Sequence, residues 1–196
     1  MRLVTERLIL REWEERDRKS LAAILGDPNV RRFYPRTVTA EEVDAQIDNA
    51  VAMAARHGFH LQAAERKADG ALIGLVGIAR IPEATRAAIP SHPEVEIGWQ
   101  LDTAYWGQGY APEAATAYLE YAWNTLELPE VVAFTAAINL PSQRVMEKIG
   151  MRRDLSDDFE SPALPEGHRL RRHIVYRIAR SAPAKCGPEF TPAEQR

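Results

Sequence analysis

Apolar side chains recur along the chain with two periods, and each period predicts one kind of element. Runs rich in Leu, Ile and Val predict strands over residues 3–13, 59–66, 72–81, 95–101, 131–138 and 173–179. Apolar residues three and four positions apart predict helices over residues 14–26, 39–56, 106–126 and 142–150. The order β-α-α-β-β-β-α-β-α-β favours a mixed α/β fold with both hairpins and strand–helix units.

Local signals mark several boundaries of these elements. Thr39 and Glu42 form a Thr-x-x-Glu capping box, and Gly58 is expected to end the helix that it opens. Asp69-Gly70 predicts a hairpin turn. The proline-containing segment 82–93 and the late segment 154–168 are expected to be loops, and Gly150 is expected to end the last helix.

Composition and charge restrict the classes of protein. The chain has 196 residues, 45% apolar and 27% charged, which suits one domain over residues 1–180. Residues 181–196 carry three prolines without periodicity and are expected to be a loose tail. A net charge of −3 does not favour nucleic acid, and no apolar run suits a signal peptide or membrane span. We expect a cytoplasmic protein with no membrane or nucleic-acid partner, and a homodimer stays open.

Metal and disulfide chemistry find little support. Cys186 is the one cysteine, so an internal disulfide and a cysteine-rich zinc site are excluded. The five histidines lack a metal-binding spacing, so no metal is expected; they are His57, His60, His92, His168 and His173.

Gly107 and Gly109 lie between a predicted strand and a predicted helix. The first amides of a helix have no internal acceptor and carry partial positive charge, so glycines there would let an anion such as a pyrophosphate approach. A tight turn that only needs positive φ explains the same glycines. Neither the Walker loop nor the dinucleotide fingerprint fits, because no Lys follows and the third glycine position holds Pro112.

Three separated motifs carry a family resemblance. Trp106-x-x-Gly109-x-Ala111 resembles the acyl-CoA loop of the GCN5-related N-acetyltransferase (GNAT) family. The segment NLPSQRVMEKIGM (139–151) is similar to that family's Asn-x-x-Ser-x-x-x-x-Glu-Lys-x-Gly-Phe segment, and TERLILREW (5–13) resembles its ribosomal-protein-alanine acetyltransferase branch. The resemblance implies a central, mostly antiparallel mixed sheet with about four helices, and acetyl-CoA as co-substrate.

The resemblance also implies which residues bind the coenzyme. The amides of the loop would hold its pyrophosphate, namely those of Gly107, Gln108, Gly109, Tyr110 and Ala111. Backbone groups of Trp99, Gln100 and Leu101 would pair with the pantetheine arm. Asn139 and Ser142 would face the far side of that arm, and Arg144 would reach a phosphate.

Two positions depart from the family pattern. Trp106 stands where Arg or Gln is usual, which removes a side-chain donor to phosphate. Met146 stands where many relatives have a Tyr as general acid toward the CoA thiol. We therefore assign the donor role to Ser142, although the same hydroxyl could be the N-cap of a helix over residues 142–149.

Amine acetylation also needs a base, because amines are mostly protonated at neutral pH. Glu94 and Glu96 lie on one face of the predicted strand, and we expect Glu96 to be the base, through water; a solvated face or an ion pair is the alternative. Backbone amides of residues 99–101 would stabilise the oxyanion. Asp157, Asp158 and Glu160 could attract a cationic acceptor or could simply be solvated.

The predicted activity is transfer of an acetyl group from acetyl-CoA to a primary amine. Direct transfer in a ternary complex is expected, since Cys186 lies far in sequence from every motif. The acceptor could be a protein N-terminus, a polyamine, an amino acid or a small amine. The alternative is an acyl-CoA-binding module without turnover, suggested by Trp106 and Met146.

Overall fold

The computed structural model describes residues 1–180, so predictions about the tail and Cys186 lie outside the described residues. The strands are β1 (Leu3–Val4), β2 (Leu8–Arg11), β3 (Gln62–Arg66), β4 (Leu72–Arg80), β5 (Val95–Leu101), β6 (Glu130–Ala136), β7 (Arg152–Glu160) and β8 (Arg172–Ala179). The helices are α1 (Asp17–Gly26), α2 (Ala40–His57), α3 (Glu83–Ala88), α4 (Tyr110–Asn124) and α5 (Leu140–Lys148), with a 3-10 turn η1 (Thr103–Tyr105). No helix in this part of the chain is long and apolar enough to cross a membrane.

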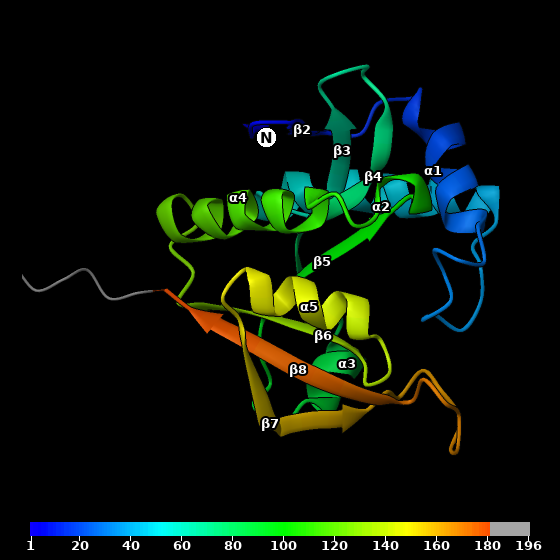
Figure 1. The fold of residues 1–196 in the computed structure, drawn as a ribbon. Helices are drawn as coiled ribbons and strands as arrows, with labels where there is room; N and C mark the ends of the chain where they lie inside the picture. Colours follow the sequence, from blue (N-terminus) through cyan, green and yellow to red (C-terminus); the bar gives the residue numbers. More distant parts are fainter. Residues whose placement is uncertain (181–196) are drawn as a thin grey trace, which may run out of the picture.

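One eight-stranded sheet organises the molecule, in the order β1-β2-β3-β4-β5-β6-β8-β7 (Figure 1). Every neighbouring pair is antiparallel except β5 and β6, which run parallel. The predicted mixed, mostly antiparallel fold is therefore confirmed. The hairpin at Asp69-Gly70 and the capping box of α2 are also present, with Gly70 at φ 70°.

Three segments differ from the sequence prediction. Residues 3–13 form two short strands rather than one, because Thr5 reverses the chain by bonding Leu8 through both its amide and its hydroxyl. The segment expected as a proline loop contains α3, whose first turn follows Pro82, a residue compatible with a helix start. The late segment expected as a loop contains most of β7, which pairs with β8. Ion pairs of Asp154 with Arg177 and of Asp158 with Arg172 also join the two strands, and hydrophobic periodicity cannot reveal them.

The sheet has a different helical layer on each face. Val95, Ile97 and Leu101 of β5 belong to the large core formed with α4 and with Met146 of α5. The intervening residues of β5 point to the other face. Gln100 is paired with Leu75 of β4, so the two side chains lie on the same face of the sheet. Leu75 packs there in a second core with α1, α2 and the connecting residues 27–39. The two faces of β5 therefore border two different regions of the molecule.

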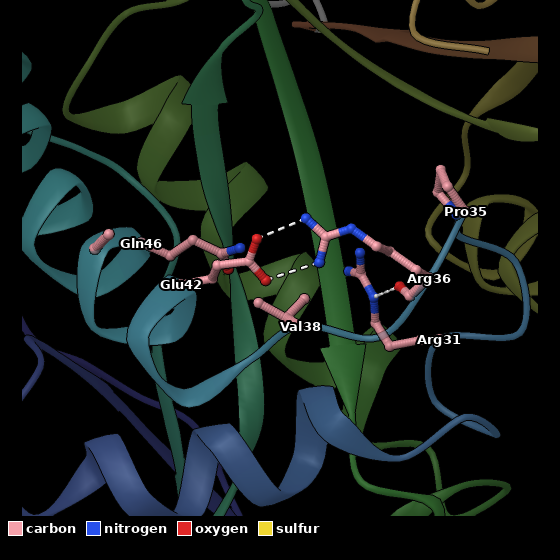
Figure 2. Close-up of a pocket in the computed structure, with 7 residues that line it drawn as sticks. Arg31, Pro35, Arg36, Val38, Glu42 and Gln46 are labelled. Atoms are coloured by element: carbon pink, nitrogen blue, oxygen red, sulfur yellow. Dashed lines mark hydrogen bonds and ion pairs between the residues drawn. The ribbon is translucent and has the colours of Figure 1, made fainter.

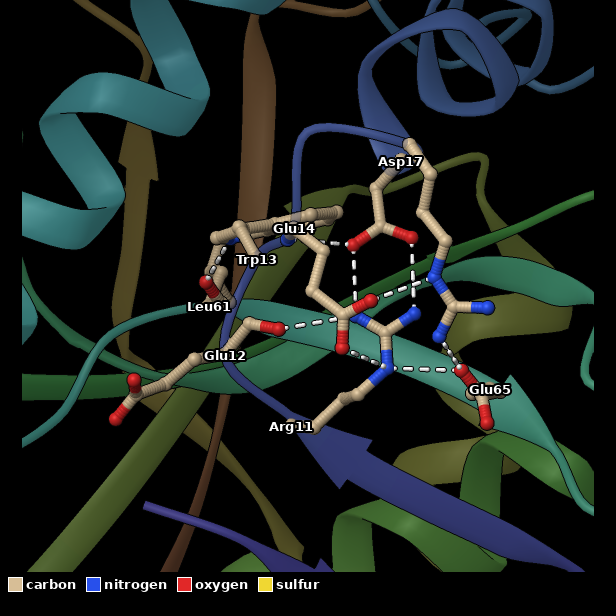
Figure 3. Close-up of polar contacts among 8 residues, drawn as sticks. Arg11, Glu12, Trp13, Glu14, Asp17, Leu61 and Glu65 are labelled. Atoms are coloured by element: carbon tan, nitrogen blue, oxygen red, sulfur yellow. Dashed lines mark hydrogen bonds and ion pairs between the residues drawn. The ribbon is translucent and has the colours of Figure 1, made fainter.

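A buried ion-pair cluster places α1 against the sheet (Figure 3). Arg11 at the end of β2 donates to both oxygens of Asp17 at 2.7 and 2.9 Å, and to Glu65 of β3 at 2.8 Å. Burial raises the pKa of Asp17, but the Arg11 hydrogen bonds outweigh it and hold the pKa below its ordinary value. This cluster positions α1, and hence the start of the segment 27–39 that follows it.

Candidate active site

The parallel strands β5 and β6 separate soon after they meet. Their only ladder pair within the described residues joins Glu96 to Val132. Beyond it the two strands diverge in Figure 1, and each leads to a helix, α4 after β5 and α5 after β6. We call the region between residues 97–101 of β5 and 133–136 of β6 the β5–β6 opening. Parallel strands end at the same edge, so the amino ends of both helices lie at this opening.

The edge of β5 that borders the opening has backbone groups to offer. The amide of Asp102 donates to Ile73 at 2.9 Å and the Glu94 carbonyl accepts from Ile81 at 3.0 Å, so even-numbered residues direct their backbone groups to β4. Odd-numbered residues then direct theirs to the opening, and Trp99 is the central one. The Leu101 carbonyl already accepts from the Trp106 indole at 2.8 Å. Gln100 points its backbone to β4 and lies on the α1–α2 face.

The entrance to α4 is built by positive-φ glycines and carries free amides. Gly107 has φ 74° and Gly109 has φ 84°, so the turn does need glycine. No side chain caps the helix. Within residues 1–180, no acceptor takes a hydrogen bond from the amides of Gly107, Gln108, Gly109, Tyr110 and Ala111. Five consecutive free amides at a helix amino end form a concentrated anion-binding surface.

Arg7, in the turn between β1 and β2, holds this loop in place. Its Nε donates to Glu113 of α4 at 2.6 Å, and its Nη1 donates to the Gln108 carbonyl at 2.9 Å. The guanidinium also stacks on the Tyr110 ring at 4.4 Å. Because the Gln108 carbonyl is held by Arg7, the amide of Gly109 in the same peptide unit points the opposite way. Arg7 thus positions the loop, while its own charge is paired with Glu113.

The amino end of α5 is capped by the side chain of the residue that precedes the helix. Asn139 is the N-cap: its Oδ1 accepts from the Ser142 amide at 3.3 Å, and its Nδ2 donates to Thr135 at 2.8 Å. The alternative of Ser142 as N-cap is therefore wrong, because the helix begins at Leu140. The Ser142 hydroxyl has no hydrogen-bond partner among the described residues. Met146 is 1% exposed and belongs to the large core, whereas Arg144 is exposed.

The two candidate carboxylates of β5 differ sharply. Glu94 is exposed and forms an ion pair with Arg80 at 3.1 Å. Glu96 is half-buried at the apex of the β5–β6 opening, and in the part of the chain that the structure describes it has no ion pair. Burial raises the pKa of Glu96 to about 8. A carboxylate of this kind can accept a proton from an amine near neutral pH.

The segment 27–39 covers the same face of the sheet as Glu96. Arg31 donates to the Gln100 side chain at 2.8 Å and stacks on the Tyr34 ring at 3.7 Å. Desolvation raises the pKa of the Tyr34 phenol, and the charge of Arg31 offsets part of this rise. Arg32 stacks on the Trp106 ring at 4.6 Å, which ties this segment to the glycine loop.

The late acidic residues are neutralised by arginines. Asp157 is buried and accepts from Ser91 and Arg177; Asp158 binds Arg153, and Glu160 binds Arg171 at 3.1 Å. Asp157 thereby joins β7 and β8 to Ser91 in the α3–β5 connection, whereas the ion pairs of Asp158 and Glu160 stay within β7, β8 and the residues between them. Among residues 1–180, no group of three or more His, Cys, Asp or Glu is placed to hold a metal ion.

Sequence reasoning missed Arg7, Arg31 and Tyr34. Arg7 belongs to the TERLILREW stretch, but its role depends on contacts with Glu113 and Gln108, about a hundred positions away. Arg31 and Tyr34 lie in a segment without periodicity, so only the unusual density of arginines and aromatics in RRFYPR (31–36) could have marked them.

Comparison with known proteins agrees with this architecture. The model of the acetyltransferase (GNAT) domain matches residues 7–152. The N-acetyltransferase YnaD of Bacillus subtilis (strain 168), itself uncharacterised, is 32% identical over 91% of this chain and 96% of its own. A GNAT-family acetyltransferase of Bacillus anthracis has a TM-score of 0.74 at 27% identity, over 91% of this chain and 98% of that one.

The ribosomal-protein-S5-alanine acetyltransferase of Vibrio fischeri shares the fold, with a TM-score of 0.69 at 16% identity over 91% of this chain and 96% of that one. These findings confirm the resemblance drawn from the glycine loop and the segment 139–151. The chain is a member of the GNAT family of acetyltransferases.

Proposed function

We propose that the protein transfers an acetyl group from acetyl-CoA to a primary amine by direct transfer in a ternary complex. Acetyl-CoA is the co-substrate of the family. The observation that carries the proposal is the row of free amides from Gly107 to Ala111 at the β5–β6 opening. A diphosphate satisfies such amides and interacts favourably with the positive end of α4.

The coenzyme fits the remaining groups of the opening. The backbone of Trp99 on β5 is free to pair with the amides of the pantetheine arm in the manner of an added strand. Leu101 takes part through its amide, since its carbonyl is held by Trp106. Gln100 belongs to the acceptor side instead, because its side chain binds Arg31. Asn139 keeps one Nδ2 hydrogen free, and Arg144 is free to approach a phosphate.

When bound, acetyl-CoA supplies a thioester carbonyl whose carbon–sulfur bond breaks as the acceptor nitrogen bonds to the carbon. Glu96 takes the proton from the amine, through a water, at the apex of the opening. The amides of β5 that face the opening donate to the developing oxyanion. Ser142 protonates the thiolate, since its hydroxyl lies in the first turn of α5 and has no hydrogen-bond partner among the described residues. Thiol pKa values lie near 8.5, so the thiolate is a good leaving group and a weak acid is enough to protonate it.

Binding of acyl-CoA without turnover is the rival function. It is suggested by Met146, which lies in the core and cannot donate a proton, and by Trp106, whose indole donates to the Leu101 carbonyl. Two measurements separate them. Thermal unfolding with and without CoA tests binding, because a ligand at about 100 times its Kd adds roughly 2.7 kcal/mol of stability. Thiol release from acetyl-CoA with a panel of amines tests transfer. A CoA-induced shift without release for any amine would favour the rival, and no shift at all would overturn both.

A further inference from the structure

Arg31 is a half-buried cation that binds neutral groups alone. Its Nε donates to the Arg36 carbonyl at 3.1 Å, its Nη1 to the Gln100 amide oxygen at 2.8 Å, and its guanidinium stacks on Tyr34. Within residues 1–180 it forms no ion pair. Burial lowers the pKa of this guanidinium. A desolvated cation without a counter-ion is costly, which indicates that its counter-ion comes from a ligand.

A hollow of about 350 Å³ lies beside Arg31, between α2 and residues 31–38 (Figure 2). Three charged residues line it, and two neutralise each other. Arg36 donates to both oxygens of Glu42, at 2.7 and 2.6 Å. Arg31 therefore leaves the hollow with one uncompensated positive charge. The volume suits a small molecule rather than a folded partner.

Arg31 and the proposed base share one face of the sheet. Arg31 is anchored on Gln100, four residues along β5 from Glu96, so the two positions are roughly 13 Å apart along the strand. Tyr34, from the same segment, stacks on Arg31 at 3.7 Å and helps to fix the position of its guanidinium. A molecule with its amine at Glu96 can reach Arg31 with a group several bonds away.

We infer that the acceptor is a small amine that carries a carboxylate several bonds from its nitrogen, and that Arg31 binds this carboxylate. The inference rests on the proposed function. A guanidinium matches a carboxylate in both geometry and charge. A polyamine would place a second positive charge against Arg31, so it is disfavoured. One unpaired guanidinium balances one negative charge, which favours a carboxylate over a doubly charged phosphate.

The test uses a series of ω-amino acids of increasing length, from glycine to aminooctanoate. Each is compared with the n-alkylamine of equal length. Aminoalkyl phosphates form a third arm. Steady-state thiol release from acetyl-CoA gives kcat and KM for each. We expect an optimum at intermediate length, with a KM for the amino acid below that of its alkylamine. Arg31→Gln should raise KM for the amino acids roughly tenfold to hundredfold and leave the alkylamines unchanged.

Two further variants sharpen the result. Glu42→Gln keeps a side chain that can complete the capping box of α2 but removes the charge paired with Arg36. The hollow therefore becomes more positive. It should lower KM for the amino acids by roughly twofold to fivefold, a change opposite in sign. Arg80→Gln removes an exposed arginine paired with Glu94 and should change neither series. CoA-induced thermal stabilisation, measured for each variant, verifies that the fold and coenzyme site persist.

Several outcomes would overturn the inference. One is a lower KM for the alkylamines or the phosphates than for the amino acids. Another is an Arg31→Gln effect that is absent or equal across the three arms. Transfer to alkylamines without any transfer to amino acids would also contradict it while leaving acetyl transfer intact. Thiol release for no amine at all would remove the proposed function, and this inference with it.

Discussion

The two helices that begin at the β5–β6 opening differ in how the backbone amides of their first turns are satisfied. At α5, Asn139 caps the helix and satisfies the Ser142 amide. At α4, the N-cap position holds Gly109, which has no side chain, and the amides of Gly107 and Gln108 have no acceptor among the described residues. Both helices follow parallel strands and begin at the same edge of the sheet. The difference indicates that the α5 entrance stabilises the fold, whereas the α4 entrance leaves its amides available, as the proposed coenzyme binding requires.

The α4 entrance is nevertheless well ordered, because its supports come from elsewhere in the chain. Glu113 accepts from Thr5 at 2.5 Å and from the Arg7 amide at 2.8 Å. Arg7 in turn fixes the Gln108 carbonyl. The loop therefore does not need to bond to its own helix end, and its amides stay available. Support from a distant segment in place of a local cap is what makes a preorganised binding site possible here.

The largest expected effect concerns the apex of the opening. Glu96→Gln should lower kcat/KM roughly 10²-fold to 10⁴-fold, because the base is lost while the shape is kept. Glu94→Gln is the matched control: it lies two residues away, is exposed and is bound to Arg80, so it should leave kcat/KM unchanged. Thiol-release kinetics measure both. Equal activity of Glu96→Gln and wild type at every pH would remove Glu96 from the mechanism.

The raised pKa of Glu96 predicts a pH dependence of both activity and stability. Activity should rise with pH as the carboxylate ionises around its pKa of about 8. In the unfolded chain a Glu ionises near pH 4.3, so wild-type stability should fall between about pH 4.3 and 8 as the folded state keeps the proton. Glu96→Gln should therefore unfold at higher temperature than wild type at pH 8 and lose this advantage near pH 4. A constant difference in melting temperature across that range would contradict the assigned burial.

Sequence patterns predicted the sheet and the α4 entrance well, for a local reason. The strands β4 and β5 and the capping box of α2 follow from residues within one element. Positive φ at Gly107 and Gly109 is a conformation that glycine permits more readily than other residues. Such features depend on the nearest neighbours along the chain, which the sequence displays directly.

Other features depend on contacts between distant residues and could not be predicted. The role of Arg7 requires α4 to pack beside the first hairpin, and β7 is joined to β8 by contacts such as Asp154–Arg177 that apolar alternation does not indicate. The contrast between Glu94 and Glu96 is of the same kind. Both carboxylates lie on one face of the predicted strand. Only the fold shows that an arginine reaches Glu94 and that, within residues 1–180, none forms an ion pair with Glu96.

The next largest effect should come from filling the α4 entrance. Gly109→Ala places a side chain at φ 84°, which costs about 1–2 kcal/mol, and brings a Cβ 3.4 Å from Arg7. We expect CoA affinity to fall at least roughly tenfold, as about 1.4 kcal/mol of amide contacts is lost. Gly150→Ala is the matched control, since it has the same φ of 84° at the other end of α5. Calorimetric titration should show normal CoA affinity for Gly150→Ala; equal losses in both would mean that strain alone matters.

A smaller effect is expected from the support of the loop. Arg7→Gln removes the ion pair with Glu113 and the clamp on the Gln108 carbonyl. Each such contact contributes about 1 kcal/mol, so CoA affinity should fall roughly threefold to tenfold and the melting temperature should decrease. Arg86→Gln removes an arginine whose Nε forms a comparable ion pair with Glu83 of α3, outside the glycine loop, and should leave CoA affinity unchanged. If Arg7→Gln lowers stability but not CoA affinity, Arg7 is a structural residue and the loop orients itself.

The smallest effect on coenzyme binding should arise at the α5 entrance, and it completes the comparison. Asn139→Ala should cost about 1 kcal/mol of unfolding free energy, because the Ser142 amide loses its cap, while CoA affinity falls less than roughly threefold. Asn139→Asp keeps a capping oxygen and should recover most of the stability. Urea unfolding and CoA titration measure the two quantities. A variant that keeps wild-type stability but no longer binds CoA would show that Asn139 serves the ligand first, and the two helix entrances would then be alike in function.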